Sequence, residues 1–367
     1  MPACFRHHER RMTATVRQDE NAALQAMAET LAEPALASRA NGRVLFLRAQ
    51  AGALDTWPGA RHWTCVQSFR PWAQPLLDAG RSVHGEIGDI GDERFDLTLV
   101  LPPKQRDEAR AWLAHAVAHT KSDGVIVAAM PNQGGARSGE RDLQRLTDFI
   151  EHRSRSKCRV FWSDLEHARI DAEVLSSWLA LDAAQPILDG RFVSRPGLFA
   201  WDRIDVASAL LAEHLPSTLR GHVADLGAGY GYLSVELLQR APGITALDLY
   251  EAEARALEPA RRNMEQMMHA LGRTMPVHVH WHDVARGLPA RYDVIVSNPP
   301  FHQGRADRPE LGQAFIRAAA EALRPQGVLW MVANRHLPYE AVLGEAFASV
   351  RTVVERDGFK VIEAVRA

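Results

Sequence analysis

The sequence predicts an α/β protein made of two tandem domains, each built on a doubly wound parallel sheet. Three observations support this prediction. In the C-terminal half, short apolar runs alternate with longer amphipathic runs, which is typical of alternating strands and helices. The same order of runs recurs in the N-terminal half. The length of 367 residues is also greater than that of one typical domain and sufficient for two separate cores.

The expected strands of the C-terminal half are short, rich in branched apolar residues and bounded by turn residues. They are 223–226, 245–249, 277–281, 293–297, 328–332, 352–356 and 360–365. The expected helices include 233–240, 254–268, 310–323 and 339–347. Only Asp357-Gly358 separates the last two strands, and this dipeptide is a hairpin signal. We therefore expect the parallel sheet to end in an antiparallel pair.

The N-terminal half matches the C-terminal half without gaps in three segments, which are 44–54 on 223–233, 95–103 on 292–300 and 124–127 on 327–330. Sheet-edge segments could resemble one another by chance, but two prolines also match in the same register. The polar and glycine positions differ: Asp225 matches Phe46, Gly227 matches Arg48, Gly229 matches Gln50 and Asn298 matches Leu101. We therefore expect a degenerate domain at 1–179 and an intact one at 180–367.

The segment Asp225-Leu226-Gly227-Ala228-Gly229-Tyr230-Gly231 lies where a strand passes into a helix. Glycines there let backbone N–H groups approach a ligand, and the helix N-terminus favours negative charge. The spacing is not Gly-x-Gly-x-x-Gly of dinucleotide-binding loops, because the third glycine comes one residue early. A carboxylate before the loop favours a ligand with a cationic amino-acid end. Asp225, Gly227, Ala228 and Gly229 are therefore candidate cofactor-binding residues.

Two further acids are candidates for the same site. Glu251 ends the second strand, about 20 residues downstream of the loop, where the ribose-binding acid of a doubly wound fold is expected. Asp248 is the alternative candidate for the ribose-binding acid, but the helix pattern that follows places Glu251 at the carboxyl end of the strand. Asp283 follows the third strand and could accept a hydrogen bond from an adenine amino group, or it could be an ordinary turn acid.

The tetrapeptide Asn298-Pro299-Pro300-Phe301 closes a strand that is apolar on both faces. Ligands of open α/β sheets bind at this carboxyl edge. An amino group on an aromatic ring is a poor nucleophile, because its lone pair is delocalised into the ring. Its nucleophilicity increases if the Asn298 side-chain oxygen and the Pro299 carbonyl each accept one of its N–H groups. Prolines hold that loop fixed, and Phe301 can stack on the ring. The alternative is a simple Asn-Pro turn.

His278, His280 and His282 alternate along one strand and share one face, where three imidazoles could hold a metal ion. We favour a solvated strand face with Val279 and Trp281 inside, and expect no metal. The three cysteines, Cys4, Cys65 and Cys158, stand too far apart for a disulfide framework or a paired zinc site.

The charges nearly balance, with 43 basic and 45 acidic side chains, so the overall charge does not indicate a nucleic-acid-binding protein. One basic cluster could contact phosphates or could be a solvated face. It comprises Arg137, Arg141, Arg145, Arg153, Arg155, Lys157 and Arg159. The start of the chain lacks a signal peptide, and no apolar run is long enough to cross a bilayer, so a cytoplasmic protein is expected.

With these motifs placed, the chain resembles the bacterial small-subunit ribosomal RNA guanine-N2 methyltransferases, the RsmC family, over nearly its whole length. The matching segments are Pro196-Gly197-Leu198-Phe199, Ile204-Asp205-Val206, the Asp225 loop, Asn298-Pro299-Pro300-Phe301-His302, Ala333-Asn334, Leu337-Pro338-Tyr339 and Phe359-Lys360-Val361. Ala200 and Ala207 depart from the family pattern, where Ser and Gly are expected.

The resemblance implies two tandem class I (Rossmann-like) methyltransferase domains, S-adenosylmethionine as methyl donor and a guanine of 16S ribosomal RNA as acceptor. It implies catalysis by Asn298, Pro299, Pro300 and Phe301, with Asn298 also near the cofactor. Substrate contacts are expected from Phe301, His302, Asn334, Arg335, Arg137 and Arg141. The partner would be 16S ribosomal RNA or the small subunit, and the protein would be a monomer.

Two classes of alternative stay open from the sequence. The first is another amino methyltransferase, acting on large-subunit guanine-N2, adenine-N6 or protein glutamine, because Asn-Pro-Pro with a following aromatic residue serves all such acceptors. The second is a non-catalytic RNA-binding or ribosome-assembly factor, which the first domain alone would suggest. The retained Asp225, Gly227, Gly229, Glu251 and Asn298 favour catalysis by the second domain.

Overall fold

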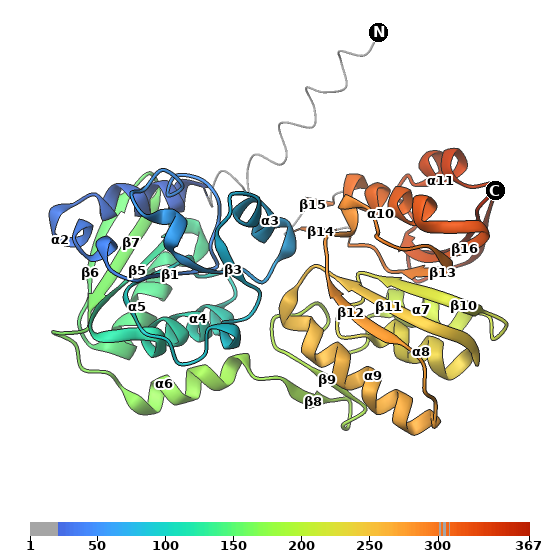
Figure 1. The fold of residues 1–367 in the computed structure, drawn as a ribbon, viewed down its shortest axis with the longest axis horizontal. Coiled ribbons are helices and arrows are strands. Elements are labelled where there is room, and N and C mark those ends of the chain that lie inside the picture. The colour runs from blue at the N-terminus through green and yellow to red at the C-terminus, as the bar shows by residue number, and fades with distance from the viewer. Residues whose placement is uncertain (1–20, 301, 304–305, 308) are drawn as a thin grey trace, which may run out of the picture. The chain divides into compact units, whose positions relative to one another are not determined.

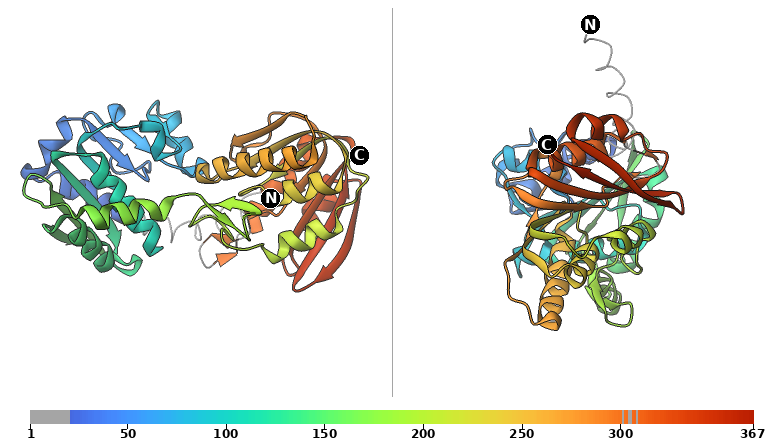
Figure 2. Two further views of the ribbon diagram at one scale, coloured as in Figure 1. Left: turned by 90° about the horizontal axis from the view of Figure 1, so that it is seen from below. Right: turned by 90° about the vertical axis from the view of Figure 1, so that its right-hand side faces the viewer.

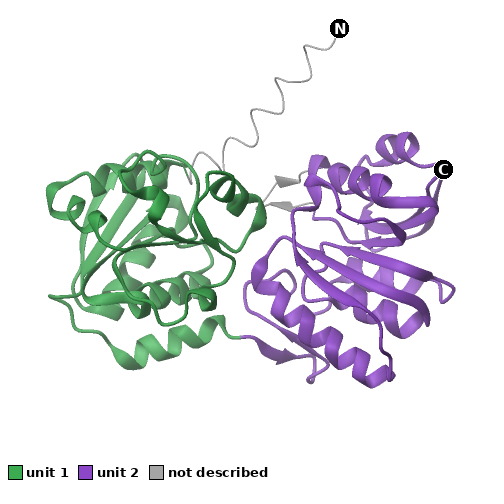
Figure 3. Cartoon of the chain, viewed as in Figure 1, with its two compact units in different colours: residues 1–183 green, residues 184–367 purple. Residues whose placement is uncertain are grey.

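The computed structural model describes residues 21–300, 302–303, 306–307 and 309–367 of the chain (Figure 1). The chain forms two compact units, 1–183 and 184–367, which are coloured separately in Figure 3. Among the described residues, no helix is both long enough and apolar enough to cross a membrane. Cys65 and Cys158, the two cysteines within this part of the chain, are buried and form no disulfide.

The first unit contains a seven-stranded sheet in the order β3-β2-β1-β4-β5-β7-β6. The strands are β1 (Val44–Leu47), β2 (Thr64–Val66), β3 (Ser82–His84), β4 (Phe95–Val100), β5 (Thr120–Pro131), β6 (Glu151–Arg155) and β7 (Cys158–Asp164). The first five pair in parallel, whereas β7 is antiparallel to β5 and β6. The helical residues 21–31 pack on one face together with α2 (Pro34–Ala37) and α3 (Arg70–Asp78). The other face is covered by α4 (Arg106–His119), α5 (Ala136–Thr147) and α6 (Ala172–Leu179).

The second unit opens with the hairpin of β8 (Gln185–Ile187) and β9 (Phe192–Ser194), followed by a seven-stranded sheet in the order β12-β11-β10-β13-β16-β18-β17. Its strands are β10 (Arg220–Leu226), β11 (Gly243–Glu251), β12 (Val277–Trp281), β13 (Tyr292–Ser297), β16 (Leu323–Asn334), β17 (Ser349–Arg356) and β18 (Phe359–Val365). One face is covered by α7 (Val206–His214), α8 (Tyr232–Arg240) and α9 (Leu257–Leu271). The opposite face carries α10 (Pro309–Ala322) and α11 (Glu340–Ala346), and Figure 2 shows this layering from two further sides.

Both sheets therefore have the same strand order, and both end in an antiparallel hairpin that inserts its last strand beside the fifth. This confirms the predicted fold class of two tandem α/β domains. The expected helix 254–268 is wrong at its start, because a 3₁₀ turn, η7 (Ala254–Ala256), precedes α9. Pro259 lies in the first turn of α9, where backbone N–H groups have no intrahelical partner, so its missing N–H costs no hydrogen bond.

Candidate active site

The candidate site lies at the carboxyl edge of the second unit's sheet, where β10, β11, β13 and β16 all end. These four strands run parallel to one another, so the residues that follow them meet at one edge. The Ser297 hydroxyl donates a hydrogen bond of 2.8 Å to the Leu226 carbonyl and thereby ties the ends of β10 and β13 together. The glycine loop follows Leu226, and Asn298 follows Ser297.

The glycine loop turns sharply, with φ values of 75°, 54° and 89° at Gly227, Gly229 and Gly231. These left-handed conformations strain any residue that has a Cβ. A Cβ built on Gly227 would lie 3.8 Å from the Asn298 carbonyl oxygen, so the loop and the start of the Asn298 segment are close neighbours. The Gly227 N–H donates to the Tyr250 carbonyl over 2.8 Å, which ties the loop to β11.

Asp225 is fully buried beneath the loop. Its Oδ2 accepts a 2.8 Å hydrogen bond from the Ser234 hydroxyl, whereas its Oδ1 is buried and has no partner among the described residues. The pKa of the Asp225 carboxyl is raised to about 7, chiefly by burial and to a lesser extent by the Glu251 charge, while the hydrogen bonds from Ser234 lower it. A buried acceptor without a donor costs free energy, so this oxygen fits the cationic amino group of a ligand.

Glu251 ends β11 beside the loop. Its Oε2 accepts the Gly229 N–H and its Oε1 accepts the Glu253 N–H, both over 2.8 Å, and burial raises the pKa of this carboxyl. The Ala252 N–H is a third backbone donor to this carboxylate, whose two oxygens offer about four lone-pair sites, so it keeps capacity to accept a ligand hydroxyl. Asp248, the rival acid, lies inside β11, where His278 and Tyr292 donate hydrogen bonds to it. The geometry thus places Glu251 rather than Asp248 at the loop.

The Asn298 side chain is held in one orientation by two residues of the second unit. Its Nδ2 donates to Asp205 Oδ2 over 3.0 Å and to the Ser208 hydroxyl over 2.8 Å. Because a carboxylate can only accept, the amide must turn its NH₂ toward Asp205. The Oδ1 of Asn298 is buried and has no partner in the described part of the chain. The site therefore contains a fixed, buried acceptor whose hydrogen-bonding capacity is not used by the described residues.

Asp205 acts at the same time as the N-cap of α7, because its Oδ2 accepts the Ser208 N–H over 2.8 Å. An acid before an apolar helical run is a recognisable capping signal in the sequence. Its contact with Asn298 spans 93 positions and had no such signal. The expected departures from the family pattern lie nearby: Ala200 has a φ of 48°, and Ala207 is buried inside α7.

The other predicted site residues occupy the same edge or lie outside the described part of the chain. Pro299 is buried and Pro300 is exposed, whereas Phe301 falls outside the described residues. His302 begins the short strand β14 (His302–Gln303), and its side chain is likewise outside the description. Asn334 is the last residue of β16 and is half-buried, and Arg335 after it is exposed. Asp283 caps the 3₁₀ turn η8 (Val284–Arg286) by accepting the Ala285 N–H over 3.1 Å.

His278 and His280 of β12 and His282, which follows the strand, do not act as one set. His278 and His280 turn toward Asp248, whereas His282 Nε2 lies 2.7 Å from the Gly287 carbonyl oxygen. The expectation of a simple solvated face fits His278, whose side chain is 62% exposed, better than His280, which stacks on Tyr250.

The equivalent edge of the first unit is filled by its own side chains. Arg48, which matches Gly227, keeps the left-handed turn with a φ of 52°, and its guanidinium donates to the Leu101 carbonyl over 2.8 Å. Leu101 is the residue that matches Asn298. Gln67 stands where register with β1 places the counterpart of Glu251, and it donates to the Ala49 carbonyl over 2.8 Å. The buried Leu24 side chain packs against Gly52 of the same loop.

The basic cluster of the first unit is partly neutralised by acids. Arg153 and Arg155 pair with Glu33, and Arg159 pairs with Glu140. Arg137, Arg141 and Lys157 are exposed and form no ion pair with any described residue. A cavity of about 370 Å³ is lined by Asn132, Gly135, Arg137, Ser138, Ser154 and Arg159. Free positive charge is therefore concentrated around α5, and Arg153, Arg155 and Arg159 contribute less than expected.

Comparison with known proteins agrees with this geometry. A family model described as Methyltransferase small domain matches residues 189–363. The Ribosomal RNA small subunit methyltransferase C of Shewanella halifaxensis is 31% identical over 80% of this chain and 84% of its own. That of Pseudomonas putida is 30% identical over 85% of this chain and 91% of its own.

A solved structure of the T. thermophilus 16S rRNA N2 G1207 methyltransferase (RsmC), in complex with AdoMet and guanosine, superposes with a TM-score of 0.73. It is 25% identical and covers 94% of this chain and 91% of its own. Identity of about 30% over most of both chains, together with the matching tandem fold, shows that the chain belongs to the ribosomal RNA small subunit methyltransferase C family.

Proposed function

We propose that this protein transfers a methyl group from S-adenosylmethionine to the exocyclic N2 amino group of a guanine in 16S ribosomal RNA. The observation that supports this most directly is the buried Oδ1 of Asn298, which has no partner in the described chain and is fixed by Asp205. A ring amino group has two N–H donors and needs acceptors at its site. Family membership and the structure of a relative with AdoMet and guanosine support the same donor and acceptor.

The residues at the loop fit S-adenosylmethionine. The unpaired Asp225 Oδ1 would accept from its ammonium group, and the free lone pairs of Glu251 would accept from its ribose hydroxyls. Asp283 would accept from the adenine amino group. When bound, the cofactor supplies an electrophilic methyl group on a sulfonium. No metal is needed, because the sulfonium already activates the methyl group.

Asn298 Oδ1 and the Pro299 carbonyl would each accept one N–H of the target amino group. These two hydrogen bonds would make the nitrogen more tetrahedral, so that its lone pair is no longer delocalised into the ring. Phe301 would stack on the guanine, and His302, Asn334 and Arg335 would contact its edge or the flanking nucleotides. A base inside a helix cannot present its amino group in this way, so the target guanine would be unstacked or flipped. The residues thus orient and desolvate the nucleophile.

The first unit, expected at 1–179, would hold the RNA through Arg137 and Arg141 without binding cofactor. Its own side chains fill the edge where the second unit keeps its polar site. The protein would act as a monomer, which light scattering in solution can measure.

The test is to incubate the protein with isotopically labelled cofactor and either deproteinised 16S RNA or small subunits from an unmethylated source. N2-methylguanosine, identified by mass spectrometry and mapped to one nucleotide, is the expected product. N6-methyladenosine, methylglutamine or modification of large-subunit RNA would assign the chain to a different amino methyltransferase. Absence of transfer with intact RNA binding would indicate an assembly factor instead.

A further inference from the structure

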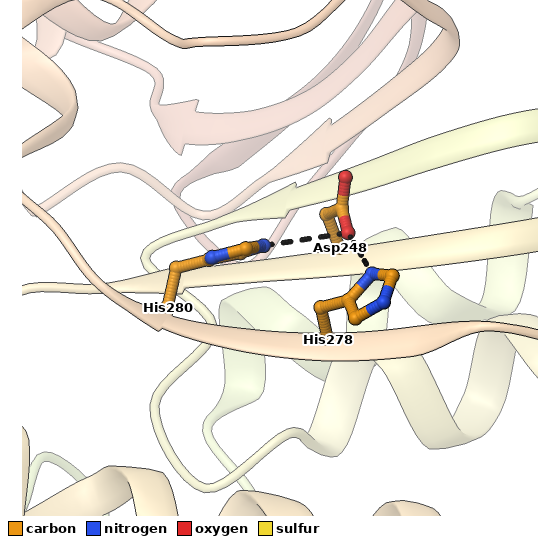
Figure 4. Close-up of side chains that lie close together, drawn as sticks. All are labelled: Asp248, His278 and His280. Atoms are coloured by element: carbon orange, nitrogen blue, oxygen red, sulfur yellow. Dashed lines mark hydrogen bonds and ion pairs between the residues drawn. The ribbon is translucent and has the colours of Figure 1, made fainter.

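A second cluster of chemically active side chains lies within the second unit, on the adjacent strands β11 and β12. Asp248 is paired in register with His278, and His280 follows two residues later on the same face of the sheet. Figure 4 shows the two imidazole rings directed toward the same carboxylate. The strand geometry alone thus brings one oxygen and two nitrogen ligands together.

The distances in this cluster suit a small divalent ion. One ring nitrogen of each histidine and one oxygen of Asp248 lie within 4.8 Å of one another. Asp248 Oδ1 lies 2.9 Å from His278 Nδ1 and 3.4 Å from His280 Nε2. In a tetrahedral zinc site with bonds of about 2.0–2.2 Å, neighbouring ligand atoms are separated by roughly 3.3 Å. Only small side-chain movements would be needed to seat an ion.

Neighbouring side chains also fix the orientation of two of the proposed ligands, as is usual at metal sites. Asp248 is 7% exposed, and its Oδ2 is held by the Tyr292 hydroxyl at 2.8 Å and by His222 Nε2 at 2.9 Å. That arrangement leaves Oδ1 facing the two imidazoles. The ring of Tyr250 stacks on His280 with centroids 4.7 Å apart, which fixes that imidazole.

We propose that Asp248, His278 and His280 form a binding site for Zn²⁺ or a similar borderline divalent transition ion. Two imidazoles and one carboxylate are a donor set that such ions prefer. His278 is 62% exposed, so an ion can enter from solvent and complete its coordination with water. The ion would clamp the edge strand β12 onto β11, whose last residue is Glu251. It takes no part in methyl transfer, so this inference does not rest on the proposed function.

A metal-free alternative uses the same atoms, with both imidazoles donating N–H groups to the Asp248 carboxylate. The two arrangements differ in their response to metal.

A comparison cluster exists in the first unit, where Asp164, Glu166 and His167 also come close together. There, His167 Nδ1 is 3.9 Å from Asp164 Oδ1 and its side chain is 66% exposed. His167 therefore provides a matched control for adventitious binding by a surface histidine.

The experiment titrates Zn²⁺ alone into the untagged full-length protein against a chelating indicator. We expect one site that His278→Gln and His280→Gln each weaken by roughly tenfold or more, since loss of even a supporting group costs metal sites 10- to 100-fold. His167→Gln should leave that site unchanged. At equal concentration, Zn²⁺ should also raise the melting temperature of the wild type more than that of His278→Gln, because stabilisation by a ligand falls as its affinity falls.

Equal Zn²⁺ affinity in the wild type and both β12 variants would overturn the proposal, as would a wild type that takes up no stoichiometric Zn²⁺. Metal bound elsewhere, for example by residues before 21, would persist in all variants and count against the site. Melting curves without metal check folding, and the exposed position of His278 keeps at least that variant informative.

Discussion

The Asp205 carboxylate and the Asn298 amide nitrogen lie 3.0 Å apart, and this contact fixes the orientation of the Asn298 amide. An amide can flip between two orientations that are equal in shape but opposite in hydrogen-bonding sense. The carboxylate accepts from NH₂ and excludes the flipped orientation. Asn298 Oδ1 is therefore held as an acceptor, which is the orientation that the proposed mechanism requires.

Replacing Asp205 by alanine should slow methyl transfer without weakening cofactor binding. The loss should be on the order of tenfold, because small misplacements at a reacting centre reduce rates strongly. Asp205→Asn keeps an acceptor for the helix cap but adds an NH₂ donor that tolerates the flipped Asn298 amide, so its rate should lie between those of Asp205→Ala and the wild type. Single-turnover rates and calorimetric affinities separate the two effects.

The control for Asp205→Ala is Asp171→Ala, which removes a comparable N-cap in the first unit. Asp171 accepts the Val174 N–H over 3.0 Å at the start of α6. Both alanine variants should lose about 1 kcal/mol of stability, as caps usually do. If Asp171→Ala slows transfer as much as Asp205→Ala, the effect is one of stability and Asp205 does not position Asn298.

Asn298→Ala should bind the cofactor almost as tightly as the wild type, because Asp225 and Glu251 are untouched. Transfer should slow by on the order of 10²–10³, the usual effect of losing one well-placed electrostatic contact at a reacting centre. Single-turnover methylation, with the product nucleoside identified by mass spectrometry, measures this. Near-normal turnover would remove Asn298 from the mechanism.

Each chain should bind one cofactor molecule. In the first unit, the Arg48 guanidinium donates to the Leu101 carbonyl and Gln67 stands in place of the acid, so that edge is filled by its own side chains and lacks the carboxylates of the second unit. Calorimetry should give a stoichiometry of one, and Asp225→Ala should abolish binding. A stoichiometry of two would mean that the first unit also binds cofactor, whereas a stoichiometry of one that survives Asp225→Ala would remove Asp225 from the cofactor site.

The sequence was sufficient for the fold, and for placing the Asp225 loop and the Asn298 segment at one sheet edge, because both depend on local pattern. The order of apolar runs, the Asp357-Gly358 turn and the matching prolines predicted two tandem sheets with the same plan. The loop from Asp225 and the segment at Asn298 were recognisable because they follow strands that end at one edge.

Contacts between distant residues could not be predicted in the same way. The bond between Asp205 and Asn298 joins two elements whose approach depends on the packing of α7 against the sheet. The pairing of Arg153 and Arg155 with Glu33 likewise required the tertiary structure, and it changes which arginines remain available. The histidines of β12 were identified as sharing a face, but Asp248 on the neighbouring strand was not predicted to be their partner.

RNA binding should depend on the arginines and lysine that lack acidic partners. The triple variant Arg137→Gln, Arg141→Gln, Lys157→Gln should weaken RNA affinity and reduce the slope of log affinity against log salt by up to about 2–3, since each phosphate contact contributes roughly 0.7–0.9. Arg153→Gln with Arg155→Gln is the matched control and should change the slope less. Cofactor affinity should stay constant in both. An unchanged slope in the triple variant would make this cluster an ordinary solvated face.

Cofactor affinity should rise with pH up to about 7 and then level off, because the pKa of the buried Asp225 carboxyl is about 7 and only its charged form attracts an ammonium group. For the cofactor-free protein, the free energy of unfolding should depend on pH in the opposite direction. The folded state holds this proton more tightly than the unfolded chain, whose carboxyl has a pKa of 3.8, so the free energy of unfolding should fall as pH rises from about 4 to about 7.

Asp225→Asn removes this titrating group while keeping its shape, so it should separate the two effects. We expect the cofactor-free variant to be more stable than the wild type above pH 7, yet to bind the cofactor more weakly and with less pH dependence. The dependence that remains would come from Glu251, whose pKa is also raised by burial. Ser234→Ala removes the hydrogen bond that favours the charged form, so it should move the midpoint of the binding profile to higher pH. Calorimetric titrations from about pH 5 to about pH 8, with denaturant unfolding over the same range, measure both quantities. If Asp225→Asn reproduces the wild-type binding profile, the buried carboxylate does not meet the cofactor.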